Sequence, residues 1–137
     1  MILLDTSVLS EPLKREPAPA VIGWLNDQAA DQLCISAVTV MEMLDGAARL
    51  DVDARRLRLE EAIHSLIARF RCLPFDEFAA RSYAPMAERA RRPGHTISMG
   101  GAQIAAVALA NGIATVATHD TRPFTAMGLQ VLDPWRV

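Results

Sequence analysis

Three acidic residues stand at positions where an acid calls for an explanation. Asp5 directly follows a run of four apolar residues at the start of the chain, and Asp120 follows an apolar segment that ends at Thr118. Glu42 interrupts an otherwise apolar stretch, where a charged side chain is normally avoided unless it is paired or bound to a metal. If the three carboxylates come close together they repel one another, so they must bind protons or share a cation.

The residue types favour one kind of cation. No histidine or cysteine accompanies the three acids at metal-ligand spacing, so the ligands would all be oxygen atoms, which suits Mg²⁺ or Mn²⁺. Such ions activate water and stabilise negative charge during phosphodiester hydrolysis. A simpler alternative exists for Asp5, because aspartate is also common where a strand turns into a helix and caps it.

The elements that must position these acids follow from the hydrophobic pattern. It predicts strands over residues 1–4, 32–35, 72–75, 113–118 and 129–132, and helices over 21–28, 37–50, 54–70, 77–92 and 99–111, with one helical turn over 124–127. Alternating strands and helices predict an α/β fold with a central, mostly parallel sheet of about five strands and helices on both faces. The carboxyl ends of parallel strands share an edge, so we expect Asp5 and Asp120 at one rim. Glu42 would reach the same rim from the helix that leaves the second strand.

Some side chains carry more specific expectations. Pro74 predicts an edge or end position for its strand, and Pro85 should kink or divide its helix. Cys34 and Cys72 fall in short apolar segments and are expected to be buried free thiols. The helix over 37–50 should bury one apolar stripe, made of Val38, Met41, Leu44 and Ala48.

Composition bounds the class of protein. The chain has 137 residues, 51% of them hydrophobic and 22% charged, which fits a single compact domain over residues 1–137. The apolar stretches are too short for a membrane span, and no signal peptide is recognisable. With two cysteines and no CxxC spacing, a reducing cytoplasm is expected.

Any nucleic-acid binding must depend on a local basic patch, because the net charge is −2. Only Lys14 among the 14 basic residues is a lysine. One cluster precedes the helix over 99–111 and could guide RNA phosphates toward the acids; it comprises Arg89, Arg91, Arg92 and His95. The alternative is an ordinary solvated helix end, where cations are favoured by the helix dipole.

Several segments, in order along the whole chain, resemble the motifs of PIN-domain nucleases, particularly the VapC and FitB-like toxins of type II toxin–antitoxin pairs. The matching segments are Met1–Pro12, Ser36–Gly46, Ile97-Ser98 with Ile104–Ala106, Ala117–Phe124 and Leu132–Trp135. The resemblance implies a three-layer α/β/α PIN fold and Mg²⁺- or Mn²⁺-dependent cleavage of RNA. It also implies a homodimer and a hetero-oligomer with a cognate antitoxin, whose C-terminal segment covers the acids.

The resemblance also assigns roles to particular residues. Asp5, Glu42 and Asp120 match the family acids that bind the metal and carry catalysis. The family's supporting hydroxyl positions are occupied here by Thr6 and Thr118, and Ser7 stands where the family usually has asparagine.

Gly101 is the important departure from the family pattern. The family places an aspartate here, in the first turn of its helix, where the dipole favours an acid. The glycine can reflect an inactivated variant, a natural degenerate toxin, or a bare backbone that lets a phosphate approach. Loss of an acid at this position predicts a weak or inactive nuclease. The alternative function is a catalytically inactive PIN scaffold that binds antitoxin or RNA without turnover.

Overall fold

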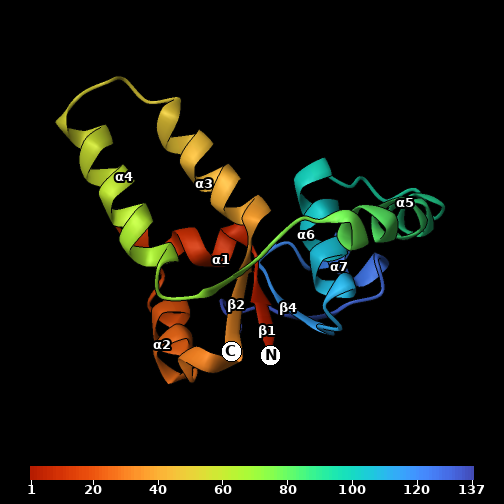
Figure 1. The fold of residues 1–137 in the computed structure, drawn as a ribbon. Coiled ribbons are helices and arrows are strands. Elements are labelled where there is room, and N and C mark those ends of the chain that lie inside the picture. The colour runs from red at the N-terminus through yellow and green to blue at the C-terminus, as the bar shows by residue number, and fades with distance from the viewer.

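A five-stranded sheet organises the computed structural model, which describes residues 1–137 (Figure 1). All neighbouring strands are parallel, in the order β3-β2-β1-β4-β5, so the first strand of the chain lies at the centre. The strands are β1 (Ile2–Leu4), β2 (Leu33–Ser36), β3 (Arg71–Leu73), β4 (Thr115–Ala117) and β5 (Gln130–Leu132). The predicted α/β class with a parallel sheet of five strands is confirmed.

Helices cover both faces of this sheet and complete three layers (Figure 1). The first layer contains α1 (Thr6–Ser10), α2 (Pro19–Asp27), α3 (Ala37–Ala48) and α4 (Ala54–Ile67), with the 3-10 turns Glu11–Leu13 and Ala30–Gln32. The opposite layer contains α5 (Glu77–Arg91), α6 (Met99–Ala110) and α7 (Thr121–Ala126). The short α1 was not predicted, because its five residues are too few to show a helical period. None of the helices has both the length and the apolar character that crossing a bilayer requires.

Two separate apolar cores explain why the strands read as continuous apolar runs. Successive side chains of a strand point to opposite faces, so a sheet covered on both sides needs apolar residues at every position. In β1, Leu3 packs into the core under α5–α7 and Leu4 into the core under α1–α4, and both are fully buried. The central strand is therefore held from both faces up to Asp5.

The predicted apolar stripe of α3 is confirmed at Val38 and wrong at Met41 and Ala48, which are exposed. The helix buries Val38, Thr39, Met43 and Ala47, whereas Met41 is 55% exposed. The reason is that a polar residue, Thr39, stands on the buried face, where its amide donates to the Ser36 hydroxyl at 3.1 Å. Because threonine is polar, a pattern of apolar residues does not include it. The stripe predicted from the apolar residues therefore differs from the face of α3 that is buried.

The expectation for the two cysteines is confirmed for one and wrong for the other. Cys34 is buried as expected, and burial raises the pKa of its thiol to about 11. Cys72 is exposed, because β3 is an edge strand, although partial burial still raises the pKa of its thiol. That edge position agrees with the expectation from Pro74. The helix α5 is not divided, since it runs unbroken past Pro85.

Candidate active site

A pocket of about 190 Å³ at the carboxyl edge of the sheet brings the three predicted acids together. Asp5, Glu42 and Asp120 all line it, and Gly101 lies in the same wall. Asp5 follows β1 and Asp120 follows β4, the two strands that pair side by side at the centre of the sheet. Glu42 reaches the pocket from α3, which leaves the strand on the other side of β1.

Asp5 is held by hydroxyl groups and does not cap α1. Although it occupies the N-cap position, its side chain makes no capping hydrogen bond. Instead its Oδ2 atom accepts hydrogen bonds from Ser7 Oγ at 2.9 Å and Thr118 Oγ1 at 2.8 Å. No protein hydrogen bond reaches Oδ1. One oxygen is thus anchored and the other remains available to a ligand, while the residue as a whole is 9% exposed.

The same two hydroxyls connect Asp5 to the backbone that carries Asp120. Ser7 Oγ accepts from the amide of His119 at 3.2 Å, and Thr118 Oγ1 accepts from the amide of Asp120 at 3.0 Å. Each hydroxyl therefore donates to the Asp5 carboxylate and accepts from the loop after β4. This double bridge sets the position of the Asp120 backbone relative to Asp5. The serine at position 7, where the family usually has asparagine, still makes both contacts.

Glu42 occupies a more open environment than its apolar sequence context indicates. The residue is exposed on the pocket side of α3, so the expected cost of burying its charge does not arise. Its Oε1 atom accepts a hydrogen bond from Thr6 Oγ1 at 2.9 Å. The Thr6 hydroxyl also lies 3.2 Å from Thr39 Oγ1, which ties it to the buried face of α3.

Gly101 lies in the first turn of α6, at the place where a side chain would enter the pocket. Ser98 caps this helix, and its Oγ accepts from the Gly101 amide at 3.0 Å. A Cβ atom at position 101 would lie only 2.9 Å from the same Ser98 Oγ. An aspartate there would therefore face the other acids, but the serine hydroxyl would have to turn aside to admit it.

The donor set fits a hard divalent cation in chemistry but not in arrangement. All potential ligands are carboxylate or hydroxyl oxygens, which Mg²⁺ and Mn²⁺ prefer. However, no three acidic, histidine or cysteine side chains converge closely enough to hold an ion as they stand. The carboxylates of Asp5, Glu42 and Asp120 would have to draw together around a metal, and position 101 supplies no fourth acid.

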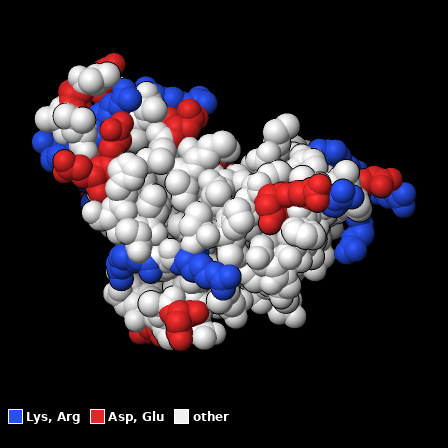
Figure 2. Space-filling model, in the orientation of Figure 1, with Lys and Arg blue, Asp and Glu red and all other residues white.

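The predicted basic cluster lies outside this pocket. Figure 2 shows charged side chains gathered at the tip of the α3–α4 hairpin and at the far end of α5. Arg89 lies beside Gly128 and lines a hollow with Leu109, near the C-terminal end of α6, and Arg92 pairs with Glu88 at 3.0 Å. Arg91 and His95 are exposed but do not line the acid pocket. None of the four residues lines the acid pocket, and their contact with RNA stays a prediction.

Sequence reasoning missed an aromatic group beside Asp120. The rings of His119 and Trp135 lie 4.3 Å apart between centroids, and His119 Nδ1 is 3.5 Å from Asp133 Oδ1. The amide of Trp135 also donates to Asp133 Oδ1 at 3.0 Å. These contacts hold the C-terminal segment around Trp135 against the loop that carries Asp120. The only sequence signal was the Asp-Pro-Trp ending itself.

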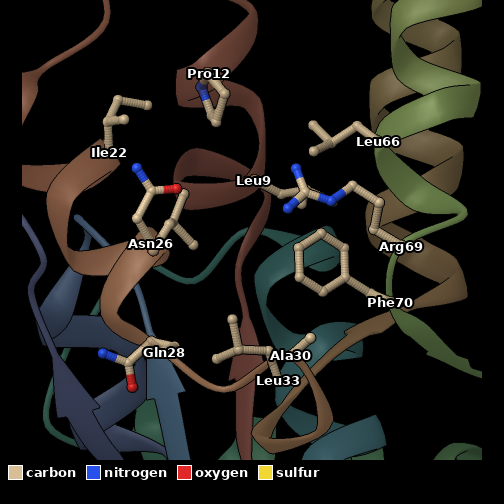
Figure 3. Close-up of a pocket in the computed structure, with 11 residues that line it drawn as sticks. Leu9, Pro12, Ile22, Asn26, Gln28, Ala30, Leu33, Leu66, Arg69 and Phe70 are labelled. Atoms are coloured by element: carbon tan, nitrogen blue, oxygen red, sulfur yellow. The ribbon is translucent and has the colours of Figure 1, made fainter.

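A second hollow, of about 130 Å³, lies between α2 and the end of α4 and has a different character (Figure 3). Leu9, Ile22, Leu66 and Phe70 contribute most of its apolar wall, and Arg69 is its single charged residue. Because it contains no acid, thiol or histidine, it offers no group for hydrolysis.

The chain is similar to known proteins over nearly its whole length. The family model described as "PIN domain" matches residues 2–128. The VapC ribonuclease Y4jK of Sinorhizobium fredii is 43% identical, with 98% of each chain covered. Toxin FitB of Neisseria gonorrhoeae is 40% identical over 98% of this chain and 99% of the toxin. The crystal structure of FitAcB from Neisseria gonorrhoeae superposes with a TM-score of 0.84 at 38% identity and covers both chains fully.

These matches extend over nearly the whole chain and agree with the parallel sheet and its helical layers. They include the three acid positions at the carboxyl edge, since the family model spans residues 2–128. The chain therefore belongs to the PIN-domain family, and its relatives include a VapC ribonuclease and the toxin FitB.

Proposed function

We propose that this protein is the toxin of a type II toxin–antitoxin pair and a divalent-metal-dependent endoribonuclease. One observation carries the proposal: Asp5, Glu42 and Asp120 come from three separate segments and line one pocket at the carboxyl edge of a parallel sheet. The relatives named as a ribonuclease and a toxin support the same reading. Hydrolysis of an RNA phosphodiester needs activated water and stabilised negative charge, and a divalent cation held by these carboxylates would supply both.

The three acids share one part in this proposal, and neighbouring residues support them. Asp5, Glu42 and Asp120 would hold Mg²⁺ or Mn²⁺, which when bound supplies Lewis acidity and an activated water. Ser7 and Thr118 keep Asp5 Oδ2 engaged, so that Oδ1 is the oxygen directed to a ligand. Ile104 and Phe124 also line the pocket, and they are buried apolar residues that limit access of bulk water.

The test is cleavage of a structured RNA with Mg²⁺ or Mn²⁺ by this chain and by Gly101→Asp. Because even a supporting residue of a metal site is worth about 10–100-fold in activity, the added acid should raise cleavage at least about 10-fold. Chelation of the metal should abolish the activity of both proteins. Equal rates would contradict the inactivating effect of Gly101, and absence of cleavage by both would contradict the nuclease.

A second candidate function is a PIN scaffold that binds antitoxin or RNA without turnover. Two observations favour this function: position 101 lacks an acid, and no three acidic, histidine or cysteine side chains lie close enough together to bind a metal ion. Thermal melting with added Mn²⁺ separates the two functions. A ligand that binds the native state raises the melting temperature, so an increase with Mn²⁺ supports the nuclease and no response supports the scaffold.

The proposal includes a cognate antitoxin, a homodimer and a cytoplasmic location with the RNA. A groove runs from Glu42 between α3 and α4, and its apolar wall contains Met43, Ala47, Leu59 and Ile63. Such a wall suits the apolar face of a partner helix. Co-expression with a cognate antitoxin should yield a hetero-oligomer on size-exclusion chromatography. A partner-free dimer or monomer would contradict the pairing.

A further inference from the structure

An aromatic ring lies at the rim of the acid pocket, on the loop that carries Asp120. His119 directly precedes Asp120, and its side chain is 57% exposed. Its amide donates to the hydroxyl of Ser7, which lines the pocket and itself donates to Asp5. The ring is therefore open to solvent within one residue of a candidate catalytic acid.

This exposed ring is supported from two sides. Its centroid lies 4.3 Å from that of Trp135, with the two ring planes inclined by 42°, and its Nδ1 atom is 3.5 Å from Asp133 Oδ1. Both supports are anchored, because Trp135 packs against the core under α1–α4 and its amide donates to Asp133 Oδ1 at 3.0 Å. A side chain that is already ordered loses little conformational entropy when a ligand binds to it.

The same loop also carries a cation without a partner. Arg122 is exposed, follows Asp120 by two residues and directly precedes Pro123 of the pocket wall. None of the ion pairs in the chain includes it. A phosphodiester that approaches three carboxylates is repelled by them, and a nearby guanidinium offsets part of that repulsion. An aromatic ring and a free cation thus occur together at this rim.

The other two histidines of the chain lack this setting. His64 is exposed on α4, and His95 is exposed in the segment before α6. Neither lines the acid pocket, and neither ring contacts another aromatic ring. A supported and exposed imidazole is therefore a feature of the loop at Asp120.

We propose that His119, backed by Trp135, is a stacking platform for one base of a single-stranded RNA segment at the acid pocket. Bases of single-stranded RNA can be splayed out and stacked on aromatic side chains, histidine included. Because the ring is one residue from Asp120, the stacked base belongs to a nucleotide close to the phosphate at the acids. This inference rests on the proposed function, since it names the form of RNA that the site takes, but it requires no bound metal.

The test measures RNA binding by fluorescence anisotropy in the presence of a chelator. The probe is a fluorescein-labelled oligoribonucleotide of about ten uridines. His119→Ala should weaken its affinity at least about 5-fold, because base–aromatic stacking is lost. His119→Phe should retain the affinity, and His64→Ala, the same change at a remote exposed histidine, should leave it unchanged. An oligomer of the same length without bases should bind the wild-type protein and His119→Ala equally.

The possible outcomes separate the platform from its alternatives. The platform is overturned if the wild-type protein does not bind the probe, or if His119→Ala binds it as tightly as His64→Ala. If His119→Phe also loses affinity and the salt dependence of binding falls, the imidazole binds a phosphate and not a base. If His119→Ala binds RNA normally but no longer co-purifies with the antitoxin, the ring is a protein contact.

A separate cleavage assay keeps the failure of this inference distinct from the failure of the proposed function. Binding that depends on His119, in a protein that cleaves no RNA with Mg²⁺ or Mn²⁺, supports the platform and overturns the nuclease. Metal-dependent cleavage with RNA binding that is indifferent to His119→Ala overturns the platform and leaves the nuclease in place.

Discussion

The two halves of the acid pocket are built in different ways. On one side, Asp5 is 9% exposed and its Oδ2 receives two hydroxyl hydrogen bonds that continue to the loop of Asp120. On the other side, Glu42 is exposed and has a single side-chain hydrogen bond, from Thr6. The position of the Asp5 carboxylate is set by the edge of the sheet. The position of the Glu42 carboxylate is set by the packing of α3 against α6. We infer that the Asp5 half is rigid and the Glu42 half adjustable.

The largest effect on RNA cleavage is expected for Asp5→Asn, which tests the Asp5 half of the pocket. The amide keeps the shape and can still accept the two hydroxyl hydrogen bonds, but it loses the negative charge. We expect RNA cleavage to fall by at least about 100-fold, because loss of a direct ligand should exceed the effect of a supporting residue. The rate is best measured in the Gly101→Asp background, where activity should be higher. Retention of that rate would remove Asp5 from the catalytic site.

Thr118→Val tests the rigidity of the Asp5 half. The buried hydroxyl donates to Asp5 and accepts from the Asp120 amide, and valine can do neither. Leaving these groups unsatisfied should lower the free energy of unfolding by about 1–3 kcal/mol, measured by urea denaturation. Ser7→Ala, at a less buried hydroxyl, should cost less and serves as the comparison. An equal cost for both would argue against a rigid, buried anchor at Thr118.

Glu11 provides a contrast, as a buried acid outside the pocket. Burial alone would raise the pKa of its carboxyl, but hydrogen bonds from Lys14 and the Ala18 amide, with the charge of Lys14, lower the pKa below its ordinary value of 4.5. A lowered pKa in the native state means that the charged form stabilises the fold above pH 4.5, and this is lost as pH falls through the lowered pKa.

Glu11→Gln should therefore reduce the loss of melting temperature on acidification below pH 4.5, without affecting metal response. Thermal melting across that range, with and without Mn²⁺, makes the measurement. An unchanged acid profile would mean that other carboxylates govern acid unfolding. A changed Mn²⁺ response would place Glu11 within the functional site.

Glu42→Gln should have the smallest effect of these substitutions, measured as the change in the free energy of unfolding. Because the side chain is exposed and singly hydrogen-bonded, the free energy of unfolding of the metal-free protein should change by less than about 0.5 kcal/mol. Urea denaturation without metal measures it. A loss as large as that of Thr118→Val would show that the Glu42 half is as tightly built as the Asp5 half.

The sequence by itself determined the architecture and the meeting of the acids. Alternating apolar and amphipathic segments require a parallel sheet covered on both faces, and the carboxyl ends of parallel strands share one edge. Asp5 and Asp120 could therefore be placed together from their positions after two apolar runs. The motif order along the chain identified the family and pointed to Glu42 and to the glycine at position 101.

Only the tertiary structure decided which faces are covered and which groups touch. Met41 and Cys72 lie on faces that no other element covers, so both are exposed although their sequence contexts are apolar. Glu42 and Gly101 are far apart in the chain, and they line one pocket only because α3 and α6 pack against each other at the same sheet edge. The spacing of apolar residues predicts which face of a single helix is buried. A site formed by two helices also depends on how the helices are placed relative to each other, which this spacing does not predict.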